Sequence, residues 1–102
     1  MPTSITLQEL QKLQQQNAGE HHLIDLRTTH EYAQGHAIGA KNLPYDLLMT
    51  YPDAYLNRKN TYYLICEYGF VSHRACVILQ THGYHVVSIN GGYQANQRCP
   101  YY

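Results

Sequence analysis

The strongest constraint on the fold comes from the middle of the chain, where an apolar run is followed by a loop and a helical pattern. Residues 62–66 read YYLIC, which is apolar throughout, as expected for a strand covered on both faces of a sheet. The loop that follows ends at Ser72, which we expect to cap a helix that stops at Gly83. Residues 85–89 indicate the next strand. A strand–helix–strand order of this kind requires a parallel sheet.

The rest of the chain continues the same alternation. Thr6 and Glu9 fit a capping box at the start of a first helix. Thr28 and Glu31 fit a second capping box, for a short helix that stops at Gly35. Further strands are expected at residues 22–26 and 40–43, and helical pieces at residues 45–56, interrupted by Pro52, and 93–97. We therefore expect one α/β domain over residues 1–102, with helices on both faces of the sheet.

Composition excludes several classes of function. Seven basic residues balance seven acidic ones, so bulk charge attracts neither nucleic acid nor an anionic membrane. No apolar run approaches the roughly 18 residues of a membrane span, and the first residues lack the pattern of a signal peptide. The three cysteines, Cys66, Cys76 and Cys99, are odd in number and show no disulfide spacing. We therefore expect a cytoplasmic protein with free thiols and no nucleic-acid or membrane partner.

Cys66 stands where the clearest strand ends, and ligands of parallel sheets bind at the carboxyl ends of the strands. Gly69 can take positive φ, so the tight loop after Cys66 can turn several backbone N–H groups inward. The start of the next helix adds unpaired N–H groups and the positive end of its dipole. These groups favour an anion, either the Cys66 thiolate or a bound oxyanion, without a histidine base. The alternative is a buried cysteine that packs as a small hydrophobe.

Several motifs stand in a familiar order. Residues 23–45, LIDLRTTHEYAQGHAIGAKNLPY, resemble a D-x-R, E-[YF], G-H-I-x-G-A and N-[IL]-P stretch. Residues 66–72, CEYGFVS, resemble a loop of the form C-x-x-G-x-R-S, and residues 86–96, VVSINGGYQAN, resemble a strand followed by G-G-x-x-x-W. Together they resemble the rhodanese-like domain family of single-domain sulfurtransferases, over about residues 4–97.

The resemblance implies a doubly wound parallel sheet of about five strands. It also implies that Cys66 accepts a sulfane sulfur and becomes a persulfide, which a second molecule then unloads. The expected partners are a small sulfane-sulfur donor and a thiol or protein acceptor, and no cofactor is implied. The residues expected to form the substrate-binding loop are Glu67, Tyr68, Gly69, Phe70, Val71 and Ser72.

Two departures from the family pattern concern anion binding. Val71 stands where the family usually has arginine, and Glu67 stands where basic or neutral residues are common. Asn96 lies near the position of the family's closing tryptophan. Arginine gives a forked, charge-assisted contact to an oxyanion, so we expect weak activity with thiosulfate. Arg74, in the first turn of the helix, is a possible replacement contact.

Other candidate residues have structural interpretations. The resemblance implies that Asp25 holds the neighbouring loop and that Arg27 pairs with Glu31, since a partly buried charge needs a partner. His73 and Cys76 are spaced to share a metal ion, but no further ligands are evident, so no metal is expected. We expect Cys76 to lie in the core. Cys99 is expected to be a tail cysteine, with a role as a resolving thiol as the alternative.

Two other functions remain as alternatives to sulfur transfer. A non-catalytic rhodanese-like binding or regulatory module would explain the departures at Glu67 and Val71, but it has no need of the Cys66 thiol. A cysteine phosphatase or arsenate reductase would need an arginine at the end of the loop to stabilise the transferred group. Val71 and Ser72 occupy those places, which disfavours phosphoryl chemistry.

Overall fold

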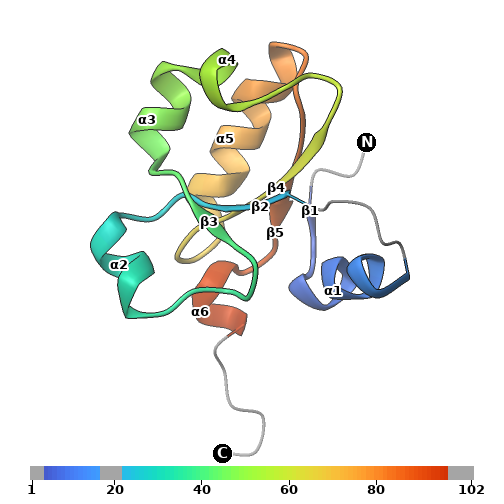
Figure 1. Cartoon of the computed structure of the whole chain (residues 1–102), viewed down its shortest axis with the longest axis vertical. Helices are drawn as coiled ribbons and strands as arrows, with labels where there is room; N and C mark the ends of the chain where they lie inside the picture. Colours follow the sequence, from blue (N-terminus) through green and yellow to red (C-terminus); the bar gives the residue numbers. More distant parts are fainter. Residues whose placement is uncertain (1–3, 17–21, 97–102) are drawn as a thin grey trace, which may run out of the picture.

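The computed structural model describes residues 4–16 and 22–96, which form a five-stranded sheet with helices on both faces (Figure 1). All four strand pairs are parallel, and the strand order is β1-β5-β4-β2-β3. This confirms the predicted α/β fold. The strands are β1 (Ser4–Ile5), β2 (His22–Asp25), β3 (Lys41–Asn42), β4 (Thr61–Ile65) and β5 (His85–Ile89).

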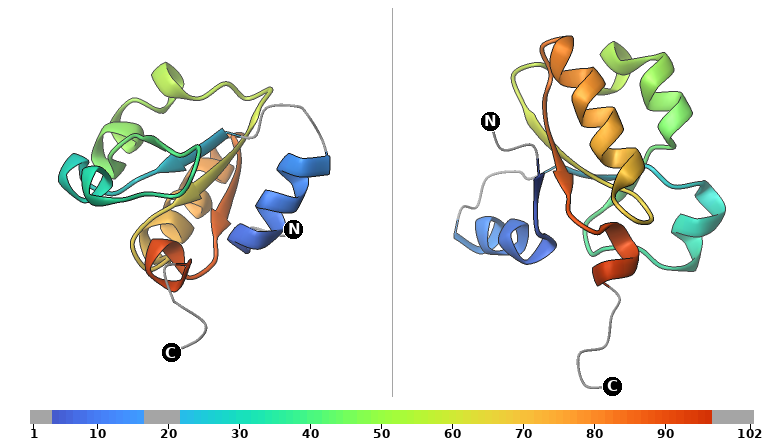
Figure 2. Two further views of the ribbon diagram at one scale, coloured as in Figure 1. Left: turned by 60° about the horizontal axis from the view of Figure 1, so that its bottom comes forward. Right: turned by 180° about the vertical axis from the view of Figure 1, so that it is seen from behind.

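The helices cover the sheet in two layers, with α3, α4 and α5 on one face and α1 and α6 on the other (Figures 1 and 2). Their bounds are α1 (Leu7–Gln16), α2 (Thr29–Gln34), α3 (Tyr45–Thr50), α4 (Pro52–Tyr55), α5 (Phe70–Thr81) and α6 (Gly92–Asn96). None of these helices is long and apolar enough to cross a membrane.

The central strand β4 shows why the apolar run 62–66 fits a sheet covered on both faces. Leu64 belongs to the core cluster under α5, whereas Ile65 belongs to the cluster on the opposite face. Both side chains are fully buried, because successive residues of a strand point to opposite faces. Val77 of α5 is apolar but 48% exposed.

Both predicted capping boxes are present. Thr6 Oγ1 accepts from the Glu9 N–H at 3.0 Å, and Glu9 accepts from the Thr6 N–H at 2.8 Å. Thr28 and Glu31 make the same reciprocal pair at the start of α2, which ends at Gly35. These contacts use only neighbouring residues, which is why the sequence alone predicts them.

The strand β1 was not predicted from the residues. It has two residues, Ser4 and Ile5, which pair with Ser88 and Ile89 of β5. A segment this short cannot show the alternating pattern by which strands are recognised. It becomes a strand because the edge of β5 supplies its partners.

Candidate active site

The loop after β4 wraps the sulfur of Cys66 with backbone donors. Cys66 directly follows the last residue of β4 and is 3% exposed. Its Sγ accepts from the Gly69 N–H at 3.1 Å and from the Ser72 N–H at 3.2 Å. Gly69 has φ of +97°, a conformation that favours glycine and that turns these donors toward the sulfur. The site is therefore a small cradle of N–H groups at the start of α5.

Ser72 does not cap the helix, and that prediction was wrong. α5 begins at Phe70, and its N-cap is Gly69, which has no side chain to act as a cap. Ser72 lies in the first turn and is fully buried. Its Oγ is 3.4 Å from Cys66 Sγ, 3.3 Å from the Gly69 carbonyl oxygen and 2.7 Å from Ser88 Oγ. The Ser72 side chain, which the sequence suggested as a helix cap, therefore contacts Cys66 instead.

The start of α6 holds the cradle from the outside. The Tyr93 N–H donates to the Cys66 carbonyl at 2.8 Å, and the Gln94 N–H donates to the Glu67 carbonyl at 3.0 Å. Gly92, with φ of +64°, lies against the same peptide group: a Cβ added there would lie 2.5 Å from the Cys66 carbonyl oxygen. The carbonyls of Cys66 and Glu67 thus point toward α6, while the N–H groups of Gly69 and Ser72 point toward the sulfur.

We expect Gly92→Ala to lower the free energy of unfolding by about 2–3 kcal/mol, because the new Cβ clashes with backbone in addition to the strain of positive φ. Gly39→Ala is the matched control, since Gly39 has φ of +85° but open space around a Cβ. That control should cost about 1–2 kcal/mol. Urea unfolding measures both. Equal losses would show that the close approach of α6 to the Cys66 loop contributes nothing.

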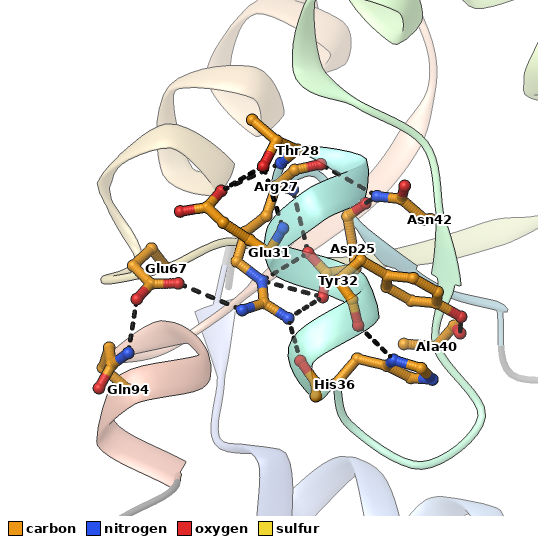
Figure 3. Close-up of polar contacts among 11 residues, drawn as sticks. Asp25, Arg27, Thr28, Glu31, Tyr32, His36, Ala40, Asn42, Glu67 and Gln94 are labelled. Atoms are coloured by element: carbon orange, nitrogen blue, oxygen red, sulfur yellow. Dashed lines mark hydrogen bonds and ion pairs between the residues drawn. The ribbon is translucent and has the colours of Figure 1, made fainter.

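Glu67 of the loop takes part in an ion-pair network with Arg27, as Figure 3 shows. Its carboxylate lies 3.3 Å from Arg27 Nη1 and also accepts a hydrogen bond from the Gln94 side chain. The Glu67 side chain is 28% exposed, and the paired Arg27 side chain 5%. The glutamate that departs from the family pattern therefore ties the loop to β2 and α6.

Arg27 is the centre of this network. Its guanidinium binds both carboxylate oxygens of Asp25, with the shortest contact at 2.8 Å, and donates to the Gly35 carbonyl at 2.7 Å (Figure 3). It also lies 4.1 Å from the centre of the Tyr93 ring. Hydrogen bonding to Asp25 raises the pKa of Arg27, and Glu67 adds to the effect. The network joins β2, the Cys66 loop and α6.

The predicted pairing of Arg27 with Glu31 was wrong. The Glu31 carboxylate accepts from the backbone N–H and the hydroxyl of Thr28, both at 3.1 Å. Glu31, which the resemblance assigned to Arg27, is used instead in the capping box with Thr28. Glu67 pairs with Arg27 in place of Glu31. Asp25 also accepts from the Arg27 N–H at 3.0 Å, a contact within the segment that follows β2.

The rim of the cradle is apolar. Tyr68, Phe70 and Val71 are 63%, 81% and 44% exposed. Arg74 is exposed on α5, and no hydrogen bond or ion pair among the described residues joins it to the loop. The role of Arg74 as a replacement contact therefore stays a prediction.

The other two cysteines of the chain are Cys76 and Cys99. Cys76 is fully buried in the core beneath α5, and this burial, with a smaller contribution from Cys66, raises its pKa to about 12. Cys99 lies outside the described residues. His73 and Cys76 gain no further ligands: in residues 4–16 and 22–96, no group of three or more metal-ligating side chains is present.

We expect iodoacetamide to label Cys66 and to leave Cys76 unlabelled in the folded protein between pH 7 and pH 9. The raised pKa keeps Cys76 as the unreactive neutral thiol until the pH approaches about 12. Peptide mapping by mass spectrometry measures both sites in one digest. Denatured protein is the control, in which both thiols should react, and labelling of Cys76 at the rate of Cys66 in the folded protein would contradict the expectation.

Three contributors to the site were not found from the sequence: Ser88, Gly92 and the side chain of Gln94. Ser88 gave a weak signal, because it is a polar residue between Val87 and Ile89 of β5, on the same face as Val86. The pairing of Glu67 with Gln94 and Arg27 gave none, because these residues are far apart in the chain.

Comparison with known proteins shows the family. Residues 6–99 match the family described as the rhodanese-like domain, so the chain belongs to that family, as its motifs predicted. The protein HIGH ARSENIC CONTENT 1, mitochondrial, of Arabidopsis thaliana is 34% identical over an alignment of 87 residues, which covers 74% of this chain and 52% of that protein. The chain spans about half the length of this curated relative.

Solved structures show the same fold. SSP1007 from Staphylococcus saprophyticus is 34% identical, with a TM-score of 0.78 over 93% of this chain and 92% of that one. A rhodanese-like domain protein from Staphylococcus aureus is 32% identical, with a TM-score of 0.78 over 93% and 90%. The human single-domain sulfurtransferase TSTD1 is 22% identical, with a TM-score of 0.79 over 97% and 100%, a likeness of fold.

Proposed function

We propose that this protein is a sulfurtransferase or persulfide carrier, and that Cys66 is its catalytic residue. The observation that supports this most is the cradle in which the Gly69 and Ser72 N–H groups both donate to Cys66 Sγ. Such donors stabilise negative charge on the sulfur, both when it attacks and when it leaves. Membership of the rhodanese-like family agrees with this chemistry.

The reaction has two half-reactions. In the first, the Cys66 thiolate attacks the outer sulfur of the donor, the bond between that sulfur and the rest of the donor breaks, and the electron pair leaves with the donor remnant. With thiosulfate the remnant is sulfite. In the second, a thiolate or cyanide attacks the outer sulfur of the persulfide, and the electron pair of the broken S–S bond returns to Cys66 Sγ. No cofactor, oxidant or reductant is consumed.

Intact mass spectrometry tests the proposal directly. The protein is incubated with inorganic polysulfide, freed of excess reagent and weighed before and after addition of cyanide. We expect a gain of one sulfur atom at Cys66 and its loss as thiocyanate. A chain that folds but never gains sulfur with polysulfide, thiosulfate or a small organic persulfide would instead support the non-catalytic binding module.

We further propose that thiosulfate is a poor donor for this site. The apolar rim offers no positive charge to a dianion, and the nearby Arg27 is engaged by Asp25 and Glu67. Small organic persulfides or persulfides on a protein, which do not need an anion clamp, are the donor class that fits better. The acceptor, a thiol or a protein, must also reach Cys66 past this apolar rim.

Val71→Arg should increase thiosulfate:cyanide sulfur transfer about tenfold to a hundredfold, since a charge-assisted contact contributes about 1.5–3 kcal/mol. Val77→Arg is the matched control: it adds the same charge at an exposed position of the same helix, further from the cradle. Adding Glu67→Gln should increase the gain, because the new arginine then has no carboxylate to pair with. A folded double variant no faster than the parent would show that position 71 does not face the donor.

A further inference from the structure

Behind Cys66 lies a pair of buried hydroxyl groups that sulfur transfer as described does not use. Ser72 of α5 is fully buried and Ser88 of β5 is 2% exposed. Their Oγ atoms are 2.7 Å apart, and Ser72 Oγ is 3.4 Å from Cys66 Sγ. The three side chains form a chain of contacts from Cys66 after β4, through Ser72, to Ser88 of β5.

Ser88 lies in a strand that is paired on both sides. Its backbone pairs with Leu64 of β4 on one side and with Ser4 of β1 on the other. A hydroxyl at this register therefore has a fixed position relative to the end of β4, where Cys66 begins the loop.

The directions of the hydrogen bonds follow from counting protons. Each hydroxyl has one proton to donate and can accept from others. Ser72 Oγ is the only partner of Ser88 Oγ among the described residues, so Ser88 satisfies its proton by donating to Ser72. The Ser72 hydroxyl donates to the Gly69 carbonyl, while the neutral Cys66 thiol donates to Ser72 Oγ. When Cys66 becomes a thiolate it has no proton to donate, and the Ser72 hydroxyl can turn to donate to Cys66 Sγ.

We propose that Ser88 is a positioning residue, which holds the Ser72 hydroxyl as a third donor to Cys66 Sγ when that sulfur carries negative charge. The inference rests on the proposed function. Its effect is largest in the second half-reaction: the nucleophile's electron pair forms a bond to the outer sulfur, the S–S bond breaks, and its electron pair stays on Cys66 Sγ. The Gly69 N–H, the Ser72 N–H and the Ser72 hydroxyl then face the new thiolate together.

Two buried serines could instead satisfy only each other and contribute to stability alone. The two interpretations differ in what links the residues. If Ser88 acts through Ser72, then removing Ser88 has no further effect on chemistry once the Ser72 hydroxyl is gone. If the pair is only structural, Ser88→Ala affects unfolding and leaves the reactivity of the sulfur unchanged.

The test is a double-mutant cycle on Ser72→Ala, Ser88→Ala and the combined variant. Ser88→Thr keeps the hydroxyl, and Val86→Ala is the packing control on the same face of the same strand. Each protein is loaded with polysulfide, and its unloading by cyanide is followed in a single turnover. Ser88→Ala should slow unloading about three- to tenfold, a loss typical of one hydrogen bond. Ser88→Thr and Val86→Ala should stay within about twofold of the parent.

The double variant should equal Ser72→Ala. Independent, multiplying losses would overturn the proposal, as would a Ser88→Ala loss no larger than that of Val86→Ala. The second readout is the pH profile of Cys66 alkylation, which needs no sulfur transfer. Its midpoint should rise by about half a pH unit in Ser72→Ala and Ser88→Ala, because a donor to the charged form is lost. If neither the parent nor any variant takes up sulfur, the proposed function is wrong. The role of Ser88 is rejected as well if the pH profile of Cys66 alkylation is the same in the parent and in Ser88→Ala.

Discussion

We expect sulfur transfer to fall to background when Cys66 is replaced by serine. The change keeps the size of the side chain but removes the atom that forms the persulfide, so the loss should be at least about a thousandfold. Transfer from a small organic persulfide to cyanide, measured as thiocyanate, gives the rate. Circular dichroism of the variant shows that the fold is intact.

The other thiols are the controls for this prediction. Cys76→Ala and Cys99→Ser should keep most of the activity, since Cys76 is fully buried and stays protonated, and Cys99 is not required by the two half-reactions. Equal losses in Cys66→Ser and Cys99→Ser would show that Cys99 resolves the persulfide. The same activity in Cys66→Ser as in the parent would refute the assignment of the catalytic residue.

Replacement of Arg27 by methionine should lower the free energy of unfolding by about 3–5 kcal/mol, which is typical when one partner of a buried ion pair is removed. Asp25 is fully buried and would keep an unpaired charge, and Glu67 would lose the contact that ties the Cys66 loop to β2. Urea unfolding measures the loss.

Arg58→Met is the matched control, because Arg58 also combines an ion pair with an aromatic contact. It pairs with Asp53 and stacks on Tyr84, but its side chain is 53% exposed. Its loss should be below about 1 kcal/mol. Adding Asp25→Asn to Arg27→Met should recover part of the stability, since the buried charge is removed with its partner. Similar losses for the two arginines would mean that burial of the Asp25–Arg27 pair has no energetic consequence.

The parts of the fold that sequence predicts are those determined by nearby residues. The capping boxes at Thr6 and Thr28 involve residues three positions apart, and the strand around Leu64 is indicated by its own apolar residues. The position of Cys66 after β4 follows from the same local reasoning. Gly69 was expected to turn the loop, and its positive φ does so.

The parts that sequence did not predict depend on contacts between distant segments. Glu67 and Arg27 are 40 positions apart, so nothing local shows that the glutamate pairs with this arginine. Ser72 and Ser88 meet only because α5 packs on β5. Ser72 also looked like a helix cap because serine favours that role, but burial against Cys66 determines its contacts instead.

The lengths of the strands affect how readily the domain aggregates at high protein concentration. The two outer strands, β1 and β3, have two residues each, whereas the inner strands are longer and paired on both sides. Unpaired backbone at a sheet edge is a template for aggregation, and short edges with exposed lysine limit it. β3 carries the exposed Lys41. The sheet therefore offers little backbone on which a second molecule could build an intermolecular sheet, although its interior strands are strongly apolar.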